Sequence, residues 1–150
     1  MPEWIEPVFD RTEEDVEYAR AYNKSPSESA SSEYKGALNA SDLNRIEGNC
    51  AYLSELLHSC GYTSHVTVKT DWNMTDFPTL TEFTRIRDNI TELMRAYAQA
   101  EDMPDMRTDS RTDYVEINNM EFDLYRINEM IANMKAIYIY SGELYGGELW

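Results

Sequence analysis

The chain has 150 residues, 28 of them acidic and 13 basic, which gives a formal net charge of −15 at pH 7. A surface of that sign repels nucleic-acid phosphate and anionic lipid, so nucleic-acid and membrane partners are disfavoured and basic protein partners are favoured. The length and a hydrophobic content of 42% indicate one globular domain, residues 1–150, that buries a core without disulfides or metal ions.

The first eleven residues predict an extended leader. Its apolar side chains are expected to lie against the body of the protein; they are Trp4, Ile5, Val8 and Phe9. The leader lacks the basic start and apolar core of a signal peptide, and no stretch approaches the roughly 20 apolar residues of a membrane helix. We therefore expect a cytoplasmic protein whose two cysteines, Cys50 and Cys60, stay reduced.

A short helix is predicted after the leader, over residues 12–23. Thr12 and Asp15 have the spacing of a capping box, and the acids of the first turn suit the positive end of the helix dipole. Residues 24–37 are polar and rich in serine, which predicts a flexible polar linker.

One pattern then occurs three times: an acid, an apolar residue, any residue, and Arg-Ile. It occupies residues 42–46, 82–86 and 123–127, at intervals of 40 and 41 residues. Each copy opens a series of apolar residues spaced 3, 4, 3 and 4 apart, the seam of a helix that packs against others at about 20°. The three seams are Leu43, Ile46, Cys50, Leu53 and Leu57; Phe83, Ile86, Ile90, Leu93 and Tyr97; and Leu124, Ile127, Ile131, Met134 and Tyr138.

Capping-box spacings predict where these helices begin. The pairs are Asn39 with Asp42, Thr79 with Glu82, and Asn118 with Glu121. Gly61 is a natural stop for the first helix, and the third helix is expected to end near Ser141, so residues 141–150 form a non-helical aromatic tail. Gly48 lies inside the first helix at a cost of about 1 kcal/mol relative to alanine, so we expect a close helix or backbone contact there.

The predicted fold is all-α: a three-helix bundle of ~40-residue repeats with an extra short N-terminal helix and at most one short strand. The strand would use the alternating residues 65–70. After it, Trp72 and Phe77 are expected to hold the connection in place. Connections of about 16 residues are long enough for each helix to reverse direction, which predicts an up-down-up arrangement.

The acid and arginine of each pattern are three residues apart and share one helix face. They predict surface ion pairs worth about 0.2–0.5 kcal/mol each. The alternative is that Arg45, Arg85 and Arg126 bridge to neighbouring helices or to a partner.

Residue spacings characteristic of an active site or a metal site are not found in the sequence. The arrangement of Cys50, His58, Cys60 and His65 does not fit structural zinc, and Cys50, on the seam, is expected to be buried as a small hydrophobe. The acids of residues 102–113 lack the glycine-centred loop that binds calcium. With neither a nucleophile elbow nor a phosphate loop, we expect a protein that is not an enzyme and holds no cofactor or metal.

Four segments, residues 10–16, 35–47, 72–79 and 141–148, resemble uncharacterised phage and prophage structural proteins of Gram-positive gut bacteria. The resemblance implies a tail or virion component, present in the host cytoplasm and incorporated in the virion. It supplies no catalytic residues.

The leading hypothesis is therefore a non-enzymatic phage or prophage structural or assembly protein that binds other phage structural proteins or itself. The expected partner-binding residues are Trp4, Arg45, Arg85, Arg126, Tyr140, Tyr145 and Trp150. The alternative is an acidic mimic of DNA that inhibits a host nucleic-acid-binding protein, motivated by the net charge of −15. Arginines that interrupt the acidic faces argue against this alternative.

Overall fold

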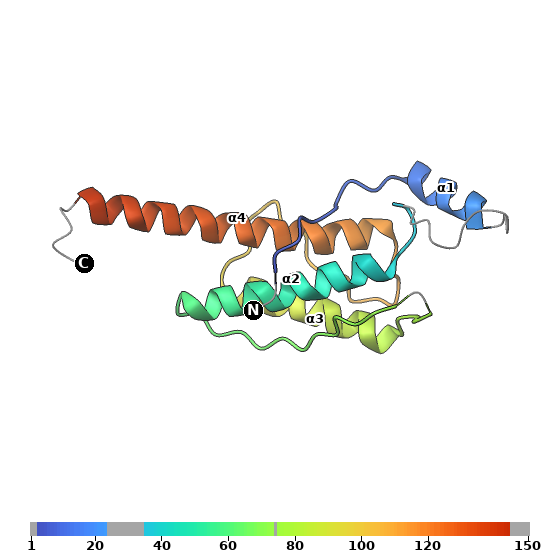
Figure 1. Cartoon of the computed structure of the whole chain (residues 1–150), viewed down its shortest axis with the longest axis horizontal. Coiled ribbons are helices and arrows are strands. Elements are labelled where there is room, and N and C mark those ends of the chain that lie inside the picture. Colours follow the sequence, from blue (N-terminus) through green and yellow to red (C-terminus); the bar gives the residue numbers. More distant parts are fainter. Residues whose placement is uncertain (1–2, 24–34, 74, 145–150) are drawn as a thin grey trace.

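The computed structural model describes residues 3–23, 35–73 and 75–144, and their side chains except at 22–23 and 138–144. This described part contains four α-helices and no β-strand: α1 (Glu13–Asn23), α2 (Ala40–Ser59), α3 (Leu80–Ala96) and α4 (Tyr114–Leu144). Each of α2, α3 and α4 contacts the other two, whereas α1 lies beside one end of this three-helix body (Figure 1). The prediction of an all-α bundle with a short N-terminal helix is confirmed.

The direction of the helices differs from the prediction. Figure 1 shows α2, α3 and α4 running the same way, so the up-down-up arrangement is wrong. The ion pairs between helices are consistent with this parallel arrangement, because each joins the N-terminal half of one helix to the N-terminal half of another. Glu47 of α2 pairs with Arg85 of α3, and Arg87 of α3 pairs with Glu116 of α4. Each connection must therefore travel back along the bundle. Residues 62–79 can do so, because extended chain covers about 3.3 Å per residue and the 20-residue α2 is only about 30 Å long.

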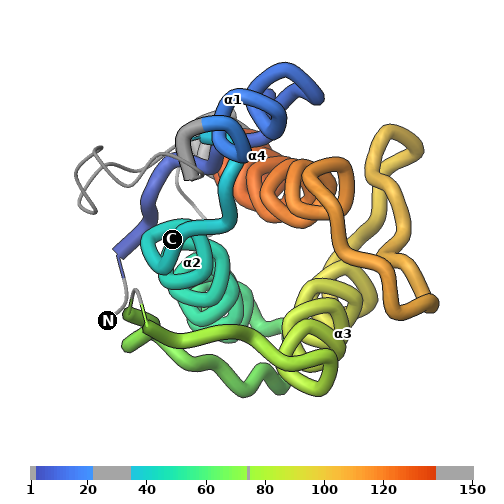
Figure 2. Tube along the Cα trace, turned by 90° about the vertical axis from the view of Figure 1, so that its right-hand side faces the viewer, coloured from blue at the N-terminus to red at the C-terminus, as the bar shows by residue number. Residues whose placement is uncertain are grey.

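Three extended segments fill the three grooves between these parallel helices (Figure 2). Strap 1 (residues 3–11) lies between α2 and α4, strap 2 (residues 62–73 and 75–79) between α2 and α3, and strap 3 (residues 97–113) between α3 and α4. The predicted strand at 65–70 belongs to strap 2. Its backbone is extended but joins no sheet, because its neighbours are helices and its hydrogen-bond partners are helix side chains.

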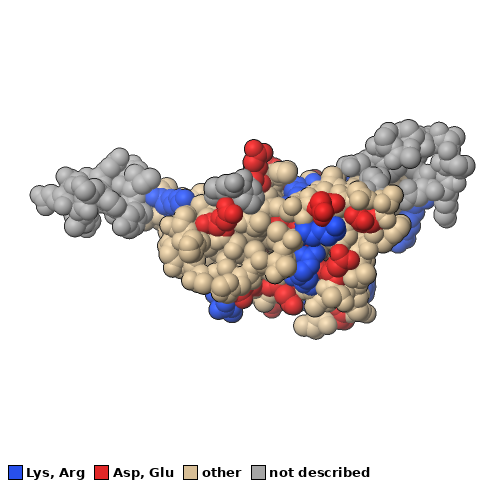
Figure 3. Space-filling view, turned by 60° about the horizontal axis from the view of Figure 1, so that its bottom comes forward, with Lys and Arg blue, Asp and Glu red and all other residues tan. Residues whose placement is uncertain are grey.

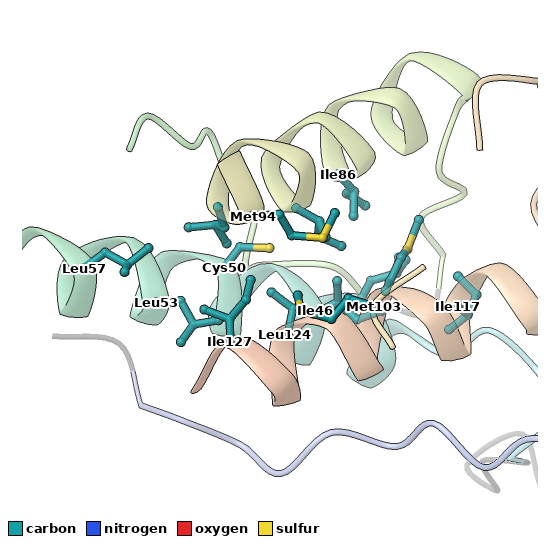
Figure 4. Packing of buried hydrophobic residues seen from close by; sticks show 14 of the residues in the cluster. Ile46, Cys50, Leu53, Leu57, Ile86, Met94, Met103, Ile117, Leu124 and Ile127 are labelled. Carbon is teal, nitrogen blue, oxygen red and sulfur yellow. The ribbon is translucent and has the colours of Figure 1, made fainter. Parts of the chain in front are cut away.

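The predicted seams form the core (Figure 4). Most seam residues of α2, α3 and α4 are buried, together with Trp72 of strap 2 and Met103 of strap 3. Cys50 is among them, as expected, and burial raises the pKa of its thiol. Both cysteines are free, with Cys60 half-buried. The helix spacing therefore identified the core although it did not identify the direction of the helices.

The start of α2 and of α3 follows the predicted capping. The Asn39 backbone N–H donates to Asp42 Oδ2 at 2.9 Å, and the Glu82 N–H donates to Thr79 Oγ1 at 3.2 Å. The start of α4 does not: it begins at Tyr114, four residues before Asn118, where the Asp113 carboxylate accepts the Glu116 N–H at 3.1 Å.

The far end of α4 also departs from the expectation. The helix continues to Leu144, so the predicted end at Ser141 is wrong. The remainder of the predicted tail, 145–150, and residues 24–34 of the predicted linker lie outside the described residues.

Two further expectations fail. A Cβ at Gly48 would meet nothing within 4 Å, so no close contact requires glycine there, and nothing in the structure explains it. Phe77 is 86% exposed and does not hold the connection in place, whereas Trp72 is 5% exposed and does.

Candidate protein-interaction surfaces

The groove between α2 and α3 is organised by Glu47, whose side chain is fully buried. Its carboxylate accepts hydrogen bonds from the Lys69 N–H at 3.0 Å and from the indole Nε1–H of Trp72 at 2.5 Å, both on strap 2. It also forms an ion pair with Arg85 of α3, and this bond raises the pKa of the Arg85 guanidinium. One buried carboxylate therefore joins two helices and the strap that covers them.

Glu121 of α4 has the same role in the groove between α2 and α4. It accepts the Val8 N–H of strap 1 at 3.1 Å and pairs with Arg45 of α2 at 2.5 Å and Arg11 of strap 1 at 2.8 Å. Asp42 completes the network by contacting both arginines. Burial alone would lower the pKa of Arg45, but the carboxylates of Glu121 and Asp42 raise it by more than burial lowers it. The net shift of the pKa is upward, and the guanidinium stays charged.

In the groove between α3 and α4 the buried carboxylate is Glu116. It accepts the Arg107 N–H of strap 3 at 3.2 Å and pairs with Arg87 of α3 at 3.3 Å. Arg87 also donates to the carbonyl of Arg111 at 2.7 Å and to Thr112 Oγ1 at 2.8 Å. All three grooves thus combine a buried glutamate, an arginine from the adjacent helix and a strap N–H.

Asparagine side chains on the helices also hold the straps, through hydrogen bonds to the strap backbone. Each asparagine amide accepts the N–H and donates to the C=O of one strap residue, so that both backbone groups of that residue are satisfied. The pairs are Asn44 with Trp72, Asn49 with Ile5, Asn89 with Thr67, and Asn118 with Arg11. We call these contacts amide clamps. They replace the neighbouring strand that an extended segment would otherwise need.

These asparagines were not predicted from the sequence, although their spacing carries a signal. Asparagine follows the recurring arginine by four residues in the first two patterns, at Asn49 after Arg45 and at Asn89 after Arg85. That spacing places the two side chains on one helix face. The third pattern has Met130 at this position, so the signal was incomplete.

The predicted partner-binding arginines are placed differently from one another. Arg45 and Arg85 bridge to neighbouring helices, as one of the two alternatives proposed, and their interactions are internal rather than surface ion pairs. Arg126 is more exposed and pairs with Asp102 of strap 3 at 3.3 Å and Glu129 of α4 at 2.9 Å.

The predicted aromatic contacts lie near the two ends of the chain. Trp4 is half-buried, donates to Glu6 and lies 5.6 Å from the ring of Tyr52. It therefore packs on the body, as expected for the leader. The side chain of Tyr140, and all of Tyr145 and Trp150, lie outside the described residues.

Asp123 is the least satisfied polar side chain of the grooves. It is fully buried, and neither carboxylate oxygen has a hydrogen-bond partner. Burial raises its pKa to about 8, assisted by the charges of Asp105, Glu116 and Asp102. The acid of the first two patterns lies in the first turn of its helix, whereas α4 begins nine residues before Asp123.

Exposed apolar side chains gather away from the grooves. Phe77 and Leu80 lie where strap 2 meets α3, and Ile137, near the C-terminal end of α4, is 67% exposed. That end of α4 extends beyond the rest of the described chain (Figure 1). A shallow hollow of about 440 Å³ separates α1 from the starts of α3 and α4, with Val16, Arg20 and Phe83 in its wall. These features lie apart from the buried carboxylates of the grooves and are open to another molecule.

Among the described residues, no set of three or more His, Cys, Asp or Glu side chains is placed to hold a metal ion. No helix in the described part of the chain has the length and hydropathy needed to cross a membrane. Comparison with protein-family models, curated proteins and solved structures gives no match.

Proposed function

We propose that the chain is a non-enzymatic structural or assembly protein of a phage or prophage, and that it acts through contacts with other proteins. The observation that carries the proposal is the free end of α4. The C-terminal end of α4 continues past the ends of α2 and α3 (Figure 1), and Ile137, seven residues before the end of α4, is exposed. An exposed apolar helix face on a folded body is typical of a protein that docks on another.

The resemblance of four segments to phage and prophage structural proteins supplies the biological setting of the proposal. Virion components must keep one shape while they hold neighbours. Three parallel helices held by buried ion pairs and amide clamps suit that task. The expected partners are other virion proteins or further copies of this chain.

The experiment uses particles purified from an induced lysogen that encodes the chain with an epitope tag. We expect the tagged protein in the particles, and we expect Ile137→Glu to reduce its incorporation at least several-fold. Thr91→Glu adds the same charge at an exposed position of α3 and is expected to be incorporated normally. Particles that lack the tagged protein, with no virion protein co-purifying from the lysate, would overturn the proposal.

The alternative of a DNA mimic receives less support. Five acids, Asp42, Glu47, Glu116, Glu121 and Asp123, are buried and present no charge to a partner. The face shown in Figure 3 carries separated acids beside lysine and arginine, and not a row of acids. The alternative predicts salt-sensitive binding to a basic DNA-binding domain, and binding that is absent at low salt would exclude it.

We also propose that the chain contains three ~40-residue repeats, each with a strap that precedes a helix of the bundle; in the first, α1 lies between strap 1 and α2. In support, each groove has one buried glutamate that accepts a strap N–H. Straps 1 and 2 are also held by amide clamps, and strap 3 is held by Arg87, which donates to its backbone. The third unit departs most, since Arg126 pairs with Asp102 and not with a neighbouring helix.

A further inference from the structure

We propose that two copies of the chain associate through the free end of α4, with the two helices antiparallel. This inference rests on the proposed function and deepens it, because it names a partner for the same surface. It starts from the helix itself. The seam residues Leu124, Ile127 and Ile131 are buried by α2 and α3, Met134 is half-buried, and Ile137 is exposed. The transition marks where the bundle ends and α4 continues alone (Figure 1).

The composition of this end is unlike the rest of the chain. Between Glu129 and Glu143 the only charged residue is Lys135, in a protein with 28 acidic and 13 basic residues. Ala132 and Ala136 add small exposed side chains on α4. A helix that is apolar on most sides is normally covered by protein. The charge pattern therefore indicates that the exposed side chains between residues 132 and 137 form a surface that another protein can cover.

A second copy fits this surface for two reasons. Two chains of net charge −15 repel each other, and they approach at lowest electrostatic cost where charges are fewest. The seam is also self-complementary, because its 3-4 spacing continues from Ile131 and Met134 to position 138 beyond the bundle. Two identical helices with such a seam pack at about 20°, and a two-fold axis makes the contact the same for both copies.

The bundle determines the orientation. On the seam side of α4 lie α2 and α3 of the same copy, and both run in the direction of α4 (Figures 1 and 2). A parallel partner would have to place its own α4 where these two helices already are. An antiparallel partner instead enters from the free end, and its α4 occupies the space beyond the last residues of α2 and α3. The two bundles then lie at opposite ends of the contact.

The first experiment measures mass in solution for the full chain by sedimentation equilibrium at micromolar concentration. We expect twice the chain mass of 17.5 kDa. Ile137→Glu is expected to weaken dimerisation at least tenfold while leaving the far-UV circular dichroism unchanged, since the side chain is exposed. Phe77→Glu is the matched control, because it places the same charge on another exposed apolar residue, and it is expected to remain a dimer. A monomeric wild-type chain, or a dimer that Ile137→Glu leaves intact, overturns the proposal.

The second experiment tests the orientation with spin labels and pulsed electron resonance. Labels at Val115→Cys, in a Cys60→Ser background, mark the exposed start of α4 in each copy. If the overlap is centred near residue 138, antiparallel helices separate the labels by about 70 Å along the axis, at 1.5 Å per residue. Labels at Lys135→Cys are expected to lie close together. A short distance at both positions would show a parallel pair and overturn the proposal.

The failure of this inference is distinguishable from the failure of the proposed function. A monomeric chain that still enters virions, and that loses incorporation with Ile137→Glu, overturns self-association and leaves the proposed function in place. A dimer absent from virions overturns the proposed function and leaves the antiparallel contact.

Discussion

At the scale of single residues, Asp123 shows how position within a helix changes the chemistry of a side chain. The acid of the recurring pattern caps α2 at Asp42 and α3 at Glu82, where backbone N–H groups or an arginine satisfy it. The same acid lies inside α4 at Asp123, buried and without a hydrogen-bond partner. The pattern alone could not reveal this, because α4 begins earlier than its capping-box spacing indicated.

Asp123 should make stability depend on pH. Its folded-state pKa of about 8 is raised by burial and by Asp105, Glu116 and Asp102, whereas an unfolded aspartate has a pKa near ~3.9. Between these values the folded chain holds a proton that the unfolded chain has lost, so this residue's contribution to stability falls as pH rises from about 4 to about 8. We expect Asp123→Asn to remove that decline, which urea denaturation of both proteins at pH 5, 6, 7 and 8 would measure.

The informative quantity is the difference in unfolding free energy between variant and wild type, because the other carboxylates then cancel. It should shift in favour of the variant as pH rises, by at most about 1.4 kcal/mol per pH unit. A difference that is constant across the range would show that Asp123 is ionised in the folded chain.

The glycines of this chain give a second residue-scale prediction. Gly48 lies inside α2 with open space at its Cβ position, so Gly48→Ala should stabilise the protein by about 0.5–1 kcal/mol through helix propensity. Gly36→Ala should destabilise it, since its Cβ would lie 2.0 Å from the Asp15 carbonyl oxygen. Thermal unfolding followed by circular dichroism measures both. A lower melting temperature for Gly48→Ala would reveal a contact that the structure does not contain.

At the scale of elements, the helices were predictable and the straps were not. Helix spacing identified the core, and Asn39 and Thr79 identified two helix starts correctly. The direction of the helices depends on the path of the connections between them. The length of these connections fits two paths: a turn that makes consecutive helices antiparallel, and an extended return along the bundle that makes them parallel. Residues 65–70 alternate like a strand, but helix asparagines satisfy their backbone, which periodicity cannot show.

The amide clamps predict a distinctive pattern of hydrogen exchange in strap 2. The N–H groups of Thr67, Lys69 and Trp72 donate to helix side chains and should exchange slowly although they belong to no sheet. We expect Asn89→Ala to accelerate exchange at Thr67 at least tenfold and to leave Trp72, which Asn44 clamps, protected. Nuclear magnetic resonance resolves the single amides. Equal acceleration at both positions would mean that strap 2 opens as one unit.

At the scale of the whole molecule, charge is the dominant feature. With a net charge of −15, the acidic side chains on the surface repel one another, and salt screens this repulsion. The ion pairs of Glu47, Glu116 and Glu121 lie in the grooves, where salt screens them little. Stability should therefore rise when sodium chloride increases from about 0.02 M to about 0.2 M, as the Debye length falls toward 7–8 Å.

Differential scanning calorimetry at low protein concentration measures this effect as a rise in melting temperature. Self-association would add a dependence on protein concentration, so the measurement uses Ile137→Glu as well as the wild-type chain. A melting temperature that falls with salt in both proteins would mean that exposed ion pairs outweigh the general repulsion.

Strap 1 has a consequence for how the protein is made. Its contacts reach far along the chain, 113 residues from Val8 to Glu121 and 107 residues from Arg11 to Asn118. Its groove does not exist until α4 has left the ribosome, which at about 5–20 residues per second takes on the order of 5–20 seconds after strap 1 itself is made. Strap 1 is thus synthesised before its groove exists, and it docks only after α4 has been made. Throughout that interval Trp4, Ile5 and Phe9 are accessible to any chaperone or partner present during translation.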